Sequence, residues 1–167
     1  MNDELTAVDI RKMQEEVDYR RLQLRPKLIE DVKTAREFGD LSENFEYKAA
    51  KREKNRNDSR IRYLERMIKT AKVIDASSAP DEIGLFDRVT IYAEEDDEEQ
   101  TIQLVTTLRQ NALKGLISKE SPVGQAVMGH RKGDRVTVRV SDTYSYDLII
   151  RDVQKGSDDD SLPISAY

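Results

Sequence analysis

The stretch AREFGDLSENFEYKAA, residues 35–50, decides the fold, because it places a helix stop directly before a helix start. Glycine commonly follows the last residue of a helix, as Gly39 does here, and residues 40–42 offer side chains that cap the next helix. A connection of two or three residues makes the two helices antiparallel neighbours. The stretch therefore predicts a helical hairpin with its tip at residues 39–43.

Upstream of the tip, apolar residues recur at helical spacing from Thr6 to about Phe38. Thr6 and Asp9 have the spacing of a capping box, and so we expect the first helix to begin there. Pro26 lies inside this helix, where its missing N–H should cause a kink but no break, because the periodicity resumes directly afterwards. The second helix is expected to run from the tip to about Ile74.

Beyond residue 75 the sequence changes from helical to alternating periodicity. The segments that alternate like antiparallel strands are 86–92, 101–105, 135–140 and 146–153. Between them, Ser121 and Pro122 open a short helix that Gly129 ends. The fold class is therefore α+β, a long antiparallel coiled-coil hairpin followed by an antiparallel β domain with a short helix. The expected divisions are a hairpin at 1–75, a linker at 76–82, a β domain at 83–155 and a mobile tail at 156–167.

The composition excludes several kinds of site. The 167 residues are 37% charged, well above the ~25% of ordinary globular domains, which fits long solvated helices. The chain has no cysteine, so disulfides and thiolate zinc sites are excluded, and its one histidine, His130, cannot build a multi-histidine metal site. No stretch approaches the ~20 apolar residues of a membrane span. We expect a cytoplasmic protein that does not bind membranes.

The second helix carries an uneven charge. Residues 51–60 contain no apolar side chain, so we expect them to contribute little to the contact between the two helices. Lys48, Arg52, Arg56 and Arg60 recur every four residues and should form one basic stripe. Such a stripe is most often a solvated helix face, and the alternative is a surface for a polyanion.

The hairpin tip holds two candidate functional acids, Asp40 and Glu43. Their spacing is that of a capping box, which would make them structural. Alternatively, two exposed carboxylates can carry Mg²⁺, which usually takes one or two from a protein. They do not form a complete active site, and no catalytic triad or phosphate-binding loop accompanies them. We therefore expect a protein that is not itself an enzyme and needs groups from a partner.

Residues 35–50 closely resemble the signature of the Gre transcript-cleavage factors of bacterial RNA polymerase, with the closest likeness to the GreA type. The flanking segments 25–26 (RP) and 71–75 (AKVID) resemble the same family. So do the second-domain segments 117–129 (ISKESPVGQAVMG) and 133–134 (GD). The resemblance covers most of residues 6–153.

This resemblance implies that the β domain is FKBP-like and that the protein is a monomeric transcription elongation factor. Its hairpin would enter the secondary channel of RNA polymerase and stimulate the enzyme's own Mg²⁺-dependent cleavage of backtracked RNA. The β domain would dock on the polymerase through Ser121, Pro122, Gly129 and Asp134. The partners would be RNA polymerase and the nascent RNA 3′ end within the elongation complex.

The resemblance also assigns roles at the tip. Asp40 and Glu43 match the family's two tip acids, which would share Mg²⁺ with polymerase and position the attacking water. The free protein would not bind the ion tightly. Arg36 and Lys51 match positions that contact the RNA 3′ segment, and Arg52 is grouped with them, since basic side chains suit phosphates.

The sequence departs from the family at four places. Lys51 stands where the family often has arginine, and Phe45 stands where a small residue is usual. Residues 108–114 and 141–144 also differ from the usual loops. These departures leave open a Gre-like paralogue that occupies the channel and inhibits or regulates polymerase without cleavage. A third hypothesis is an FKBP-like prolyl isomerase or chaperone that carries a coiled coil.

Overall fold

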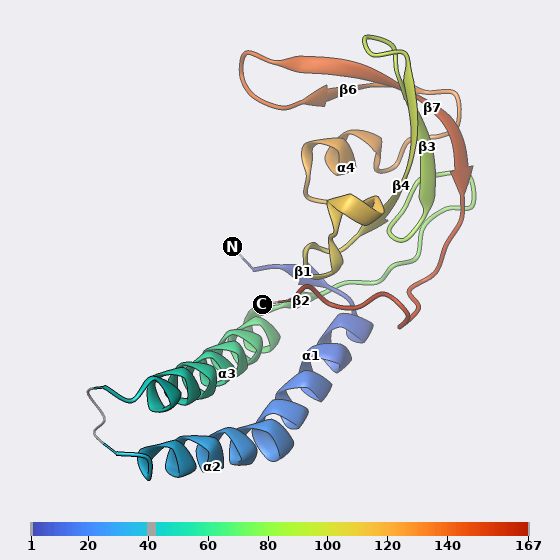
Figure 1. Ribbon diagram of the computed structural model, residues 1–167. Coiled ribbons are helices and arrows are strands. Elements are labelled where there is room, and N and C mark those ends of the chain that lie inside the picture. Colours follow the sequence, from blue (N-terminus) through green and yellow to red (C-terminus); the bar gives the residue numbers. More distant parts are fainter. Residues whose placement is uncertain (1, 40–42, 167) are drawn as a thin grey trace. The chain divides into compact units, whose positions relative to one another are not determined.

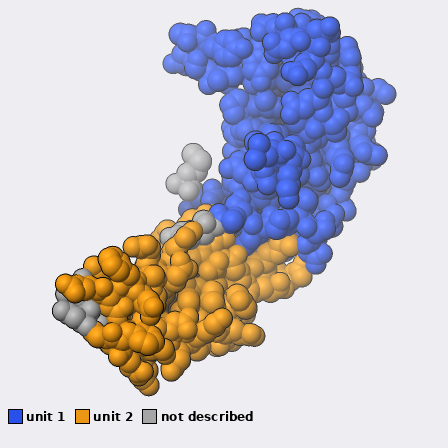
Figure 2. All heavy atoms as spheres, in the orientation of Figure 1, with its two compact units in different colours: residues 1–9, 72–166 blue, residues 10–71, 167 orange. Residues whose placement is uncertain are grey.

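The computed structural model describes residues 2–39 and 43–166, which form two compact units (Figures 1 and 2). Residues 2–9 and 72–166 form the sheet unit, and residues 10–39 and 43–71 form the hairpin unit. This division differs from the expected hairpin at 1–75, because both flanks of the hairpin pair with each other inside the sheet unit. Strand β1 (Glu4–Leu5) lies parallel to β2 (Lys72–Val73), and the N–H of Lys72 donates to the carbonyl of Asp3 at 2.8 Å.

The first arm of the hairpin has three helical segments, α1 (Ala7–Tyr19), the π-helix η1 (Arg20–Leu24) and α2 (Arg25–Arg36). The predicted capping box is confirmed, since Asp9 accepts from the N–H of Thr6 at 3.1 Å. Where the sequence predicts a kink at Pro26, the structure has the π-helix η1, which ends two residues before the proline, and the helical arm continues as predicted. In η1 the N–H of Arg25 bonds the carbonyl of Arg20, five residues back. This wider turn lets the chain pass Pro26, which has no N–H to donate, without ending the helix.

The second arm is α3 (Phe45–Thr70), which is capped by Asn44 and ends four residues before the predicted Ile74. The prediction that residues 51–60 contribute little between the helices is wrong, because Asn57 and Arg60 are both buried. Arg60 Nε donates to Glu16 Oε2 of α1 at 2.7 Å. The side-chain amide of Asn57 donates to the backbone carbonyl of Arg20, and the guanidinium of Arg20 donates to the side-chain oxygen of Asn57. A polar seam therefore continues where the apolar one, with Met13, Val17, Ile61 and Leu64 buried, stops.

This polar seam predicts a pH-dependent stability. Burial raises the pKa of Glu16, but hydrogen bonds from Arg60 and Arg20 outweigh it, and the net pKa lies below the ordinary value of 4.5. A depressed pKa means that the ionised carboxylate stabilises the folded state above pH 4.5 and that this contribution is lost as the pH falls further. We expect Glu16→Gln to destabilise the protein at pH 7 and to have a smaller effect at pH 3.5. Urea denaturation of both proteins at the two pH values measures this. An effect that grows on acidification would contradict it.

The sheet unit contains a five-stranded sheet in the order β5-β4-β3-β7-β6. Its strands are β3 (Arg88–Ala93), β4 (Glu98–Val105), β5 (Leu116–Ser118), β6 (Arg135–Arg139) and β7 (Ser145–Gln154). All four predicted strands are present, but β5 was not predicted, and it runs parallel to β4. The sheet is therefore mixed, which corrects the expected all-antiparallel arrangement, while the α+β class is confirmed.

The short helix α4 (Pro122–Val127) lies inside the curl of this sheet (Figure 1). As predicted, Ser121 caps it, with its hydroxyl accepting from the N–H of Gly124 at 3.0 Å. Val127 of α4 is fully buried in the core, together with Val89, Leu104 and Ile150 of the sheet. The curl therefore encloses an apolar core to which both α4 and the sheet contribute. In the described part of the chain, no helix combines the length and the apolar composition needed to span a membrane.

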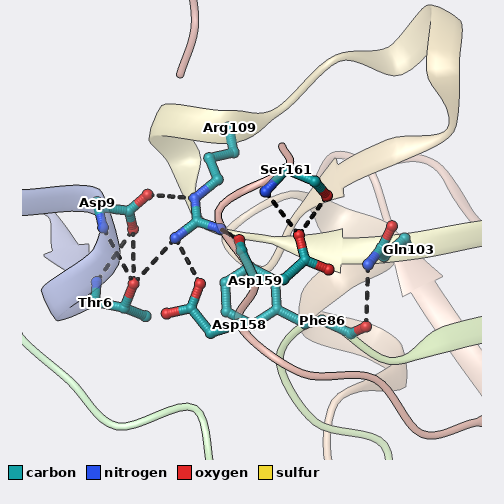
Figure 3. Close-up of polar contacts among 8 residues, drawn as sticks. All are labelled: Thr6, Asp9, Phe86, Gln103, Arg109, Asp158, Asp159 and Ser161. Atoms are coloured by element: carbon teal, nitrogen blue, oxygen red, sulfur yellow. Dashed lines mark hydrogen bonds and ion pairs between the residues drawn. The ribbon is translucent and has the colours of Figure 1, made fainter. Parts of the chain in front are cut away.

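A buried arginine joins three distant segments of the sheet unit (Figure 3). Arg109 ends the 3₁₀ helix η2 (Thr107–Arg109), and its side chain is 0% exposed. Its Nε bonds Asp9 Oδ1 at 2.5 Å, its Nη2 bonds Asp158 Oδ1 at 2.7 Å, and its guanidinium carbon lies 4.8 Å from the centre of the Phe86 ring. The sequence predicts a mobile tail at 156–167, but Asp158 of this segment forms an ion pair with Arg109, and Leu162 packs against the apolar cluster that contains Phe86.

Candidate functional site at the hairpin tip

The end of α2 and the start of α3 are joined by one side chain. Asn44 Oδ1 accepts from the N–H of Tyr47 at 2.9 Å, which caps α3. The amide of the same side chain donates to the carbonyl of Ala35 in α2 at 2.7 Å. Asn44 therefore satisfies a free donor at the start of α3 and adds a second hydrogen bond to a carbonyl at the end of α2, which also accepts from the N–H of Phe38. These two hydrogen bonds fix the spacing of the two helix ends.

The predicted helix stop is also present. Gly39 has a φ of +125°, a backbone conformation that glycine adopts at little cost and other residues rarely adopt. Glu43 is exposed and precedes α3, so it does not occupy the third helical position that the capping-box interpretation requires. Asp40 lies outside the described residues. Glu43 thus lies ahead of the helix, outside the position that a capping-box acid of α3 would have.

Two carboxylates are an incomplete ligand set for a metal ion. Among the described residues, no group of three or more histidine or acidic side chains is placed to hold one. Mg²⁺ commonly keeps several waters and takes its remaining ligands from one or two carboxylates and from phosphates. An exposed Glu43 suits an ion whose other ligands come from elsewhere.

A basic groove lies behind the tip, between α2 and α3. It has a volume of about 410 Å³, and its lining includes Arg36, Tyr47 and Lys51. The guanidinium carbon of Arg36 lies 5.4 Å from the centre of the Tyr47 ring, and the ammonium of Lys51 lies 5.9 Å from it. A hydrogen bond from Arg36 and the charge of Lys51 lower the pKa of the Tyr47 hydroxyl. The structure therefore brings Arg36 and Lys51 together around one ring.

Tyr47 was not among the residues selected from the sequence, although its spacing of four from Lys51 placed both on one helix face. Arg52, the third predicted RNA contact, lines a neighbouring groove with Lys48 and Arg56. Lys51 lines both grooves, which makes the basic surface continuous along α3. The predicted stripe ends before Arg60, because that side chain is buried against Glu16.

The four predicted docking residues lie in the sheet unit around α4. Ser121 and Pro122 begin this helix, and Gly129, with a φ of +79°, follows it and donates its N–H to the carbonyl of Ile83 at 2.9 Å. Asp134 accepts from the N–H of Arg131 at 3.0 Å and contacts His130, and these two interactions lower the pKa of its carboxyl. All four residues thus shape the local backbone, whether or not they also contact a partner.

Both units match known transcription factors. Residues 4–73 match the family described as "Transcription elongation factor, N-terminal", and residues 77–155 match "Transcription elongation factor, GreA/GreB, C-term". The hairpin and the sheet unit together therefore define a transcription elongation factor. The chain belongs to the GreA/GreB family, and its likeness to individual GreA proteins extends over almost its whole length.

Two of these relatives come from streptococci. The transcription elongation factor GreA of Streptococcus gordonii is 38% identical over 90% of this chain and 94% of its own. That of Streptococcus pneumoniae serotype 19F is 37% identical over the same shares. Among solved structures, the GreA factor homolog 1 (Gfh1) of Thermus thermophilus matches 93% of this chain and 100% of its own, at 24% identity and a TM-score of 0.43.

Proposed function

We propose that this protein binds bacterial RNA polymerase through its secondary channel and stimulates the enzyme's own cleavage of backtracked RNA 3′ ends. Arrested elongation complexes would thereby be rescued. The observation that carries this proposal is the exposed Glu43 directly before α3, on a hairpin whose two arms form a basic groove suited to RNA phosphates. Membership of the GreA/GreB family and 37–38% identity to GreA proteins support it over a paralogue that only occupies the channel.

Each part of the chain has one task in this proposal. Asp40 and Glu43 would share Mg²⁺ with polymerase and would position the attacking water. When bound, that ion supplies Lewis-acid polarisation and an activated water. Arg36, Lys51 and Arg52 bind phosphates of the extruded RNA. Ser121, Pro122, Gly129 and Asp134 present the docking surface. The protein is not an enzyme by itself, since polymerase supplies the rest of the active site, and it acts as a monomer in the cytoplasm.

A transcript-cleavage assay tests the proposal directly. A backtracked elongation complex with RNA labelled at its 5′ end is incubated with the protein and Mg²⁺, and with polymerase alone as the control. We expect transcripts that are shortened from the 3′ end and that resume elongation when nucleotides are added. Slower nucleotide addition with no shortened RNA would overturn the proposal and identify a channel-occupying regulator.

A further inference from the structure

Two of the three phenylalanines of the chain are exposed at the tip. The side chains of Phe38 and Phe45 are 67% and 81% exposed, whereas Phe86 is fully buried in the sheet unit. Phenylalanine is among the residues most often buried in proteins. Two exposed rings on either side of one short connection therefore need a reason beyond folding.

The backbone holds the two rings in a defined place. Phe38 follows the end of α2, where its N–H donates to the carbonyl of Ala35 at 3.2 Å, and Phe45 is the first residue of α3. The side chain of Asn44 bonds that same Ala35 carbonyl and caps α3. Phe38 and Phe45 line one hollow of about 480 Å³, together with Glu43, Asn44 and Glu46.

Two carboxylates line this hollow, and cations lie beyond it along α3. The ammonium of Lys48 lies 5.8 Å from the centre of the Phe45 ring, and Lys51 and Arg52 follow along α3. A base stacked on Phe45 would thus have cations beside its own phosphates. Glu43 and Glu46 line the hollow itself, where they would repel a phosphate but accept hydrogen bonds from the amino groups of a base.

We propose that Phe45, assisted by Phe38, is a stacking surface for an unpaired nucleobase of the extruded RNA 3′ segment. Aromatic rings stack on any base, so the surface accepts RNA of any sequence. Phe45 is a positioning residue, because a stacked base fixes the RNA backbone beside Glu43, which lines the same hollow. This inference rests on the proposed function, but its test has a readout that does not depend on cleavage.

The first experiment measures stacking in a backtracked complex that carries 2-aminopurine at the RNA 3′ end, with Ca²⁺ in place of Mg²⁺ to prevent cleavage. We expect the wild-type protein to quench the fluorescence, since stacking on a ring quenches this base. Phe45→Tyr should keep the quenching and Phe45→Leu should lose it. Leu22→Ala removes a side chain that is 72% exposed on η1, and this matched control should quench like the wild type. Equal quenching by Phe45→Leu would overturn the proposal.

The second experiment measures cleavage with Mg²⁺ on two RNAs, one with a normal 3′ nucleotide and one with an abasic 3′ nucleotide. We expect Phe45→Leu to slow cleavage of the normal RNA about tenfold, the size of effect that base–aromatic stacking commonly produces. It should change cleavage of the abasic RNA less than about twofold, because no base is left to stack. Equal losses on both RNAs would show that Phe45 contacts polymerase protein instead, and no loss on either would also refute the stacking role.

The two readouts separate this inference from the proposed function. A wild-type protein that cleaves without quenching would refute the stacking surface and leave the function standing. A wild-type protein that quenches the fluorescence without stimulating cleavage would refute the proposed function and leave the stacking surface standing.

Discussion

Replacing Arg109 by methionine is expected to lower the free energy of unfolding of the sheet unit by about 3–5 kcal/mol, the range for breaking a buried ion pair from one side. The variant would leave the fully buried carboxylate of Asp9 without its cation, and it would also remove the hydrogen bonds from Arg109 to Asp158 and to the hydroxyl of Thr6. Methionine roughly matches the volume of the arginine stem, so the lost free energy of unfolding would come mainly from the missing charge and its hydrogen bonds. Native-state hydrogen exchange of the β4 amides measures it within this unit.

Arg151 provides a matched control for Arg109. Its guanidinium carbon lies 3.7 Å from the centre of the Tyr92 ring, and it pairs with Glu99 at 2.8 Å, but its side chain is 46% exposed. Exposed ion pairs commonly contribute about 0–1 kcal/mol. We therefore expect Arg151→Met to have a small effect. Similar losses in the two variants would show that burial is not what makes Arg109 important.

The double replacement of Asp40 and Glu43 by alanine is expected to abolish transcript cleavage, with a loss of about 100-fold or more. Metal-ion stabilisation of a transition state contributes several kcal/mol, and each ~1.4 kcal/mol is a factor of ten in rate. Stability should change little, because Asn44 caps α3 and Glu43 is exposed. The rate of RNA shortening in a backtracked complex, at saturating protein, measures the effect.

Two controls make this result specific to the tip acids. Glu53→Ala removes another exposed acid of α3 and should leave cleavage within about twofold, as expected for a surface substitution. The double variant should still compete with the wild-type protein for polymerase, since the docking residues are intact. Cleavage at the wild-type rate by the double variant would mean that the roles assigned to both acids are wrong.

The hairpin could be predicted from the sequence because its determinants are local. A glycine stop, a proline and helical periodicity all act within a few residues of where they stand, and Ser121 caps α4 for the same reason. Strand β5 was missed because three residues are too few to show a period. The pairing of β1 with β2 was missed because it joins Glu4 to Lys72 across the whole hairpin.

For charged residues, too, local patterns could be predicted and contacts between distant positions could not. Glu16 and Arg60 are separated by 44 positions, so nothing near either of them showed that a basic side chain would be buried. Arg109 lies 100 residues from Asp9, and no spacing rule connects them. At the tip, the grouping of Arg36 with Lys51 came from family likeness alone. The structure adds a physical reason for this grouping, because both cations lie close to the ring of Tyr47.

The three-way contact of Arg109 has a consequence for the order in which the chain folds during synthesis. At ~5–20 residues per second, the 100 residues between Asp9 and Arg109 take several seconds to make, whereas helices form within about a microsecond. The hairpin can therefore fold while the sheet unit is still incomplete. Asp158 follows Arg109 by another 49 residues, so the buried guanidinium meets its second carboxylate only late in translation. The hairpin thus has time to form before the sheet unit can fold completely.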